Sequence, residues 1–112
     1  PQAPTPPAAP SPARAAAPPP GRDERKQAAQ SRSQLANRTR PLRLELQQID
    51  ARMAKLALER GELEGRLATG KRPPAEMAEA GRRLNHIAAE VAMLEERWLA
   101  LQTELEALTA PG

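Results

Sequence analysis

The sequence of 112 residues has no cysteine, no phenylalanine and no tyrosine, and its single tryptophan is the only aromatic residue. Without cysteine the chain has no disulfide bond, no thiolate nucleophile and no cysteine-ligated zinc or iron–sulfur site. With one aromatic residue and room for one domain at most, it cannot assemble a large mixed core. No apolar run approaches the ~18 residues of a membrane-spanning helix, so we expect no membrane partner and a cytoplasmic protein.

Proline and alanine dominate the first twenty residues, where they fill sixteen positions, nine of them proline. Each proline fixes φ and lacks an amide hydrogen, which disfavours both helix and sheet. Residues 1–21 are therefore predicted to be a disordered linker of semi-rigid character. Because the chain starts with Pro1 rather than methionine, we expect it to be a piece of a longer protein.

The next segment, residues 22–39, is rich in arginine, glutamine, alanine and serine and has one large apolar residue, Leu35. These residue types favour helix, but a helix that buries nothing is marginal in water. We predict a basic segment that is only partly helical. Pro41 suits the first turn of a helix, so stable helix is expected from about residue 40.

All leucine, isoleucine and valine residues lie between Leu35 and Leu108, with the spacing of a coiled coil. The first predicted helix, residues 40–68, has apolar a and d positions interrupted by Arg60. The second, residues 74–109, has five unbroken heptads. The seam comprises Leu42, Leu46, Ile49, Met53, Leu56, Leu63 and Leu67, and then Met77, Ala80, Leu84, Ile87, Val91, Leu94, Trp98, Leu101, Leu105 and Leu108.

A turn is predicted at residues 69–73, between the two helices. Gly70 suits the left-handed position after a helix, and the prolines that follow cannot continue one helix but can begin another. So short a connection makes consecutive helices antiparallel neighbours. The predicted fold class is all-α: a two-helix antiparallel coiled-coil hairpin over residues 40–109, preceded by the disordered linker.

Two registers are compatible with this hairpin. In an antiparallel pair a positions face d positions, and here they do so when the residue numbers of two facing residues sum to 140 or to 147. A sum of 140 places Arg60 opposite Ala80, where a long side chain has room, and pairs Trp98 with Leu42. A sum of 147 sets Arg60 against Ile87. The sum of 140 is preferred, with Trp98 as a large core residue.

Two motifs that could indicate chemistry have simpler interpretations. Gly65 to Lys71 spells GxxxxGK, but Arg72 stands where a phosphate-binding loop needs Ser or Thr, and a helix rather than a strand precedes it. His86, the only histidine, falls on a solvent-facing position with no second histidine or cysteine to complete a metal site. We therefore expect no catalytic residue, no cofactor and no metal in this chain.

Positive charge gathers around the predicted turn. Residues 66–83 contain five basic and two acidic side chains, whereas residues 84–112 contain one basic and five acidic ones. A basic cluster at the end of a stiff hairpin can reach phosphate backbones, although a solvated surface is the simpler interpretation. The predicted nucleic-acid-binding residues are Arg66, Lys71, Arg72, Arg82 and Arg83.

Charge on the rest of the hairpin is expected to be matched between the helices. Basic residues of the first helix lie across from glutamates of the second, in ion pairs that are individually weak. The two sets are Arg40, Arg43, Arg52 and Lys55, and Glu90, Glu95, Glu96, Glu104 and Glu106.

The stretches RPLRLELQQID at residues 40–50 and LEERWLALQTELE at residues 94–106, with the proline- and alanine-rich tether, resemble the C-terminal region of ABC-F ATPases, including Uup-type members. The resemblance covers about residues 22–109. It implies a parent with two ATP-binding cassettes and no transmembrane domain, from a family that acts on ribosomes in translation and includes members whose C-terminal arm binds DNA. ATP and magnesium are then expected only in cassettes, whose motifs this chain lacks.

These observations predict an accessory arm of an ABC-F-like ATPase that contacts DNA or ribosomal RNA through its basic tip, by backbone electrostatics without base readout. The ribosome is a candidate partner, and the isolated chain is expected to be a monomer. The alternative is a coiled coil that binds another protein or acts as a spacer, with no nucleic-acid role.

Overall fold

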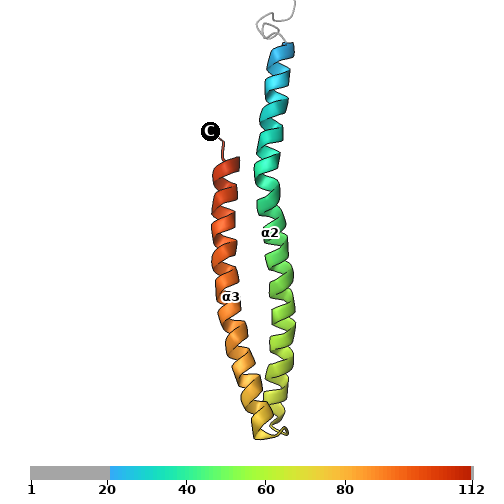
Figure 1. The fold of residues 1–112 in the computed structure, drawn as a ribbon, viewed down its shortest axis with the longest axis vertical. Helices are drawn as coiled ribbons and strands as arrows, with labels where there is room; N and C mark the ends of the chain where they lie inside the picture. The colour runs from blue at the N-terminus through green and yellow to red at the C-terminus, as the bar shows by residue number, and fades with distance from the viewer. Residues whose placement is uncertain (1–20, 112) are drawn as a thin grey trace, which may run out of the picture. The chain divides into compact units, whose positions relative to one another are not determined.

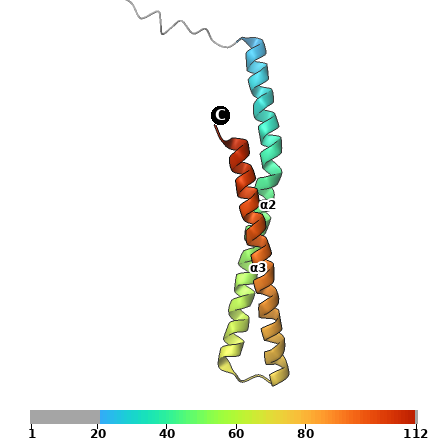
Figure 2. The same cartoon turned by 90° about the vertical axis from the view of Figure 1, so that its left-hand side faces the viewer.

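The computed structural model describes residues 21–111, which form the helices α2, Arg22–Thr69, and α3, Pro74–Thr109. Residues 35–111 form a hairpin in which the two helices lie side by side and run in opposite directions (Figure 1). In Figure 2, α3 crosses in front of α2, as helices wound around each other do. The predicted all-α hairpin is confirmed, while the predicted linker lies, apart from Gly21, outside the described residues.

The start of α2 differs from the prediction. Residues 22–39 were expected to be partly helical, and this is wrong, because α2 is continuous from Arg22 onward. Once packing has nucleated a helix, extension through residues of good propensity costs little. Asp23 and Glu24 in the first turn suit the positive end of the helix dipole. The carbonyl of Gly21 accepts a hydrogen bond from the following turn.

Pro41 lies inside α2 rather than at its start. Proline within a helix removes a backbone hydrogen bond and costs about 3 kcal/mol. The seam nevertheless continues upstream of it, since Thr39 occupies an a position and is only 2% exposed. Its hydroxyl donates to the carbonyl of Ala36 at 3.4 Å. Burial of Thr39 before Pro41 and of Leu46 after it, with partial burial of Leu42, therefore stabilises the helix across the proline.

The turn forms as the sequence predicts. Gly70 has φ +64° and follows the last residue of α2, so it takes the left-handed position that ends many helices. Pro73 is extended, with φ −56° and ψ 149°, and Pro74 is the first residue of α3. The amide of Met77 donates to the carbonyl of Pro73 at 3.1 Å, which closes the first turn of α3.

The core consists of two apolar clusters along the seam. The open-end cluster comprises Leu46, Ile49, Leu101 and Leu105, with Leu42, Met53, Leu94 and Trp98 packed against them. The turn-end cluster comprises Leu56, Leu63, Ala80 and Ile87, with Leu67, Leu84, Val91 and Leu94 packed against them. Leu94 contributes to both, so the seam is continuous along the hairpin.

These clusters fit the register with partner sum 147, and the preferred sum of 140 is wrong. A sum of 140 would pair Ile49 with Val91, yet Ile49 belongs to the open-end cluster and Val91 packs against the turn-end cluster. A sum of 147 pairs Ile49 with Trp98 and Leu56 with Val91. Each of these pairs falls within a single cluster.

The side chain of Arg60 does not need the space across the seam that the sum of 140 would provide. Its guanidinium pairs with Glu64, four residues further along α2, with 3.3 Å between Nε and Oε1. The side chain of Arg60 is 58% exposed. Because the charge leaves the seam, no space is needed opposite it. Arg60 and Ile87 line the same surface groove, where the aliphatic stem of an arginine can cover apolar surface. Ile87 is only 1% exposed.

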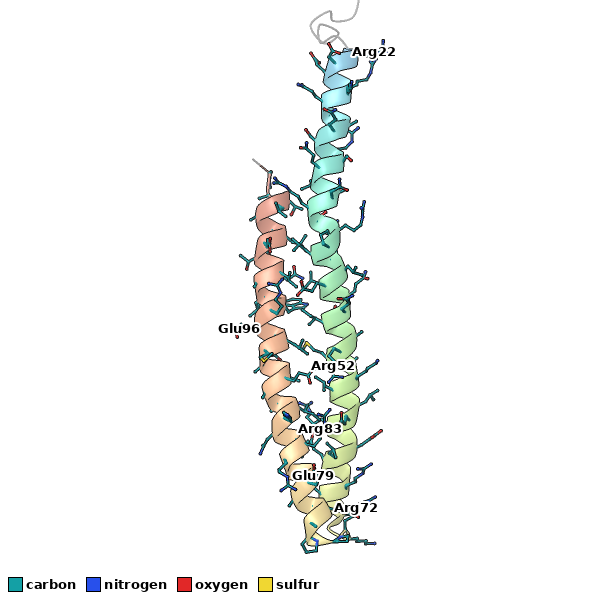
Figure 3. The ribbon with its side chains drawn as sticks, in the orientation of Figure 1. Arg22, Arg52, Arg72, Glu79, Arg83 and Glu96 are labelled. Atoms are coloured by element: carbon teal, nitrogen blue, oxygen red, sulfur yellow. The ribbon has the colours of Figure 1, made fainter. Side chains whose placement is uncertain are left out.

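One edge of the hairpin carries a ladder of three arginine–glutamate ion pairs. Each pair is bidentate, with nitrogen–oxygen distances between 2.5 and 2.9 Å. Figure 3 shows Arg52 on α2 and Arg83 on α3 directed toward the facing helix. Successive pairs are seven residues apart, as residues on one edge of a coiled coil are. The arginine–glutamate ladder consists of Glu45–Arg97, Arg52–Glu90 and Glu59–Arg83.

The register can be tested by cross-linking, because the chain has no cysteine of its own. Leu46→Cys with Leu101→Cys joins positions that sum to 147, and we expect an intramolecular disulfide on mild oxidation. Leu46→Cys with Leu94→Cys joins positions that sum to 140 and should stay reduced, since bridged Cα atoms must lie within about 7 Å. Non-reducing mass spectrometry gives the readout, and the opposite pattern would restore the sum of 140.

Truncation of Trp98 should destabilise the hairpin. The indole is half-buried against the open-end cluster, so we expect Trp98→Ala to lower the free energy of unfolding by roughly 2–4 kcal/mol, somewhat less than for a fully buried aromatic residue. Urea unfolding followed by circular dichroism measures the loss. Glu96→Ala, on an exposed position of the same helix, is the control and should stay within about 0.5 kcal/mol of the native chain. An unchanged midpoint for Trp98→Ala would contradict its core role.

Candidate nucleic-acid interface

The five predicted nucleic-acid-binding residues lie at the turn end of the hairpin. Arg66 belongs to the last turn of α2, Lys71 and Arg72 to the connection, and Arg82 and Arg83 to α3. Four are exposed and Arg83 is partly buried. The structure therefore brings all five predicted residues to the same end of the hairpin.

Three of them border a single surface depression, which we call the tip groove. It has a volume of about 330 Å³, with Leu63, Met77 and Ala80 among its apolar lining residues. Its charged lining residues are Arg66, Arg72, Glu76, Glu79 and Arg83. Lys71 and Arg82 are not part of this lining, so the structure divides the predicted set into a groove and two flanking cations.

Three of the five cations already have a carboxylate partner. Arg72 reaches Glu76 at 3.4 Å, and Arg82 reaches Glu79 at 2.6 Å; Figure 3 labels both Arg72 and Glu79 at this end. Arg83 pairs across the hairpin with Glu59 of α2. The sequence prediction counted only the two glutamates of α3 near the turn and missed Glu59, which lies on the facing helix.

Arg66 and Lys71 differ from these three. Neither side chain forms a hydrogen bond or ion pair within residues 21–111, and both are exposed. The backbone carbonyl of Arg66 accepts a hydrogen bond from the hydroxyl of Thr69 at 2.8 Å. Their positive charges are therefore the ones most available to an anion at the tip.

The ladder residues show the expected electrostatic shifts. Hydrogen bonding to Arg83 lowers the pKa of Glu59, and Arg97 and Arg52 likewise lower the pKa values of Glu45 and Glu90. The same contacts raise the pKa of each arginine. All three pairs are thus fully ionised at neutral pH.

The GxxxxGK sequence does not form a nucleotide cradle. Gly65 to Thr69 lie within the helix α2, and only Gly70 has a positive φ. An added Cβ at Gly65 or Gly70 would meet nothing within 4 Å, so neither glycine makes room for a closely approaching ligand. ATP does not fit these residues. Among residues 21–111 no group of three histidine, aspartate or glutamate side chains could hold a metal ion.

The fold and the charge distribution together define a helical-hairpin accessory domain. The family described as "ABC transporter C-terminal domain" matches residues 37–103, and the chain belongs to this family. No curated protein and no solved structure matches it. The resemblance to the C-terminal region of ABC ATPases is thus confirmed at the level of the family. The two-helix chain therefore corresponds to a C-terminal domain of an ABC-type ATPase. Neither helix in the described range contains an apolar stretch that would cross a bilayer.

The ion pairs of the arginine–glutamate ladder should make the stability of the hairpin depend on pH. A carboxylate whose folded-state pKa is lowered stabilises the fold above its unfolded pKa and loses that contribution as pH falls through the folded pKa. The melting temperature of the native chain should therefore drop as pH falls from about 5 toward 3. The triple variant Glu45→Gln, Glu59→Gln, Glu90→Gln should melt lower at pH 7 and show a flatter profile. Parallel profiles for the two proteins would mean that the ladder contributes nothing.

Proposed function

We propose that this chain is the nucleic-acid-contacting arm of an ABC-type ATPase and that its tip binds the phosphate backbone of DNA or ribosomal RNA. The observation that supports this most directly is the gathering of five basic side chains at the turn end, two of which, Arg66 and Lys71, have no carboxylate partner in the described structure. Long-range attraction to phosphate depends on such uncompensated charge.

The paired cations add a second stage to binding. The Arg72–Glu76 and Arg82–Glu79 pairs are exposed at the surface, with side chains more than half accessible, and exposed pairs are held by at most about 1 kcal/mol. A phosphate group can replace such a carboxylate, since a guanidinium can bind two phosphate oxygens at once. Arg83 is less accessible and is tied to Glu59, so we expect it to exchange least.

Contact of this kind fixes position rather than sequence. Phosphate contacts orient a protein on nucleic acid but carry no base information. The tip offers arginine and lysine without the asparagine and glutamine side chains that read base edges. The arm would then locate its ATPase on a nucleic-acid surface, such as that of a ribosome in the cytoplasm, while ATP and magnesium bind to cassettes elsewhere in the parent.

Salt dependence tests the proposal. Each neutralised phosphate contributes a slope of about −0.9 to log affinity against log salt on duplex DNA. The slope should lie between about −2, if only Arg66 and Lys71 engage, and −4.5, if all five residues do. Fluorescence anisotropy with a labelled duplex and with a ribosomal RNA fragment, at several salt concentrations, gives these slopes.

Single variants separate the two stages of binding. Arg66→Ala and Lys71→Ala should each flatten the slope by about one unit. Arg83→Ala should flatten it less, because its charge is already matched by Glu59. Arg43→Ala, an exposed cation on α2 far from the turn, is the matched control and should leave the slope unchanged. Circular dichroism confirms that each variant remains helical.

One result would overturn the assignment. If replacing Arg66, Lys71, Arg72, Arg82 and Arg83 together left binding undiminished, the tip would not be the contact. The basic residues of the N-terminal part of α2 would then be the ones to replace, namely Arg22, Arg25, Lys26, Arg32 and Arg38.

A further inference from the structure

The two edges of the hairpin seam are unlike each other. The edge with the arginine–glutamate ladder is closed by three cross-helix pairs. On the opposite edge, small residues such as Ala57 and Ala88 occupy the flanking e positions and leave the seam accessible. An apolar groove therefore runs along this edge of the seam.

This groove has two adjoining parts that share Met53 and Glu95. The first part, of about 320 Å³, is lined by Asp50, Met53, Glu95, Trp98 and Leu99. The second part, of about 190 Å³, is lined by Met53, Leu56, Ala57, Arg60, Ile87, Val91 and Glu95. We call the two together the Trp98 groove. Both lie along the seam, away from the tip groove.

The floor of the Trp98 groove is apolar, and its rim has the carboxylates of Asp50 and Glu95 together with Arg60, whose charge is paired with Glu64. Leu99 is 61% exposed and lines the groove beside Trp98. The carboxylates of Asp50 and Glu95 stand at its two sides and have no hydrogen bond or ion pair in the described structure. The glutamates of the ladder edge, by contrast, each hold an arginine.

We infer that the Trp98 groove docks an amphipathic helix of a partner protein, with apolar residues on one face and lysine or arginine beside them. An amphipathic helix lays its apolar face into a groove of this kind through residues spaced three and four apart. Met53, Trp98 and Leu99 would receive those residues. Asp50 and Glu95 would meet the flanking cations, so charge complementarity specifies a basic rather than an acidic helix.

A second copy of this chain fits the groove poorly. A symmetric dimer brings the same patch of both copies together. Asp50 and Glu95 of one copy would then face the same two carboxylates of the other, and like charges in an interface oppose association. These carboxylates therefore favour a foreign basic helix over self-association. This docking is independent of the proposed nucleic-acid contact, which uses the other end of the seam.

The only tryptophan of the chain lies in the groove, so its emission reports directly on occupancy. The full chain is titrated with a three-heptad synthetic peptide that has leucine at a and d and lysine at e and g. The lysines repel one another and keep the free peptide monomeric. We expect a saturable blue shift, because docking removes water from the half-buried indole. The matched peptide with glutamate at e and g should bind on the order of tenfold more weakly.

Variants of the groove residues test whether the peptide binds there and whether the two carboxylates set its charge preference. Asp50→Lys with Glu95→Lys should reverse the preference, so that the glutamate peptide binds better. Leu99→Asp should abolish binding of the lysine peptide. Glu96→Lys changes the same charge on the neighbouring residue, which Figure 3 shows pointing away from α2, and should preserve the preference for lysine. Circular dichroism confirms that every variant is helical.

Three outcomes would overturn the inference: no blue shift with either peptide, equal affinity for both, or a preference that the double lysine variant leaves unchanged. Sedimentation equilibrium of the chain alone is run in parallel. If the chain dimerises with a blue shift that Leu99→Asp removes, the groove belongs to a second copy and the inference of a foreign helix is wrong. None of these outcomes bears on the salt-dependence test of the tip.

Discussion

Every feature of the hairpin depends on one constraint: over residues 35–111 each helix has only the other against which to bury its apolar side chains. A hairpin of two helices has no second layer, so the a and d residues must meet their partners in one register or remain in water. The sum of 147 places Leu46 against Leu101 and Ile49 against Trp98. That register in turn decides which charged residues face each other along the two edges.

The asymmetry of those edges gives the arm two separate surfaces. On one edge, three arginines form ion pairs with glutamates of the facing helix. The opposite edge has an apolar groove with unpaired carboxylates beside it. At the tip, Arg66 and Lys71 have no carboxylate partner within the described residues. A cationic end and an acidic, apolar flank have no chemistry in common, so an accessory arm of this kind could hold two different partners at once.

Much of the hairpin could be predicted from the sequence, because its signals are local. The prolines and Gly70 define the turn through backbone geometry, and the five heptads of α3 need no knowledge of a partner. The start of α2 was mispredicted because Pro41 was given more weight than Thr39, whose a position shows that the seam continues upstream. A threonine contributes little to an apolar pattern, and its burial depends on the facing helix.

Register and pairing were harder to predict, because both depend on where long side chains go. Arg60 was treated as a side chain that needed room across the seam, whereas it pairs within its own helix. The sequence did contain a better signal. Glutamate, arginine and glutamate alternate at the g positions of α2, and their complements occur in reverse order on α3. The role of the tip cations in binding nucleic acid stays a prediction, because the position of a cation does not specify its ligand.

The four-residue connection also limits how such an arm can change in length. Inserting one residue within either helix would shift every later partner sum by one and bring seam residues against polar ones. Equal additions to both helices beside residues 70–73 leave the open-end pairs untouched, and whole heptads keep the turn on the same face. Each such step moves the tip outward by about 10 Å at 1.5 Å per residue. The reach of the arm can therefore be lengthened in discrete increments without redesigning its base.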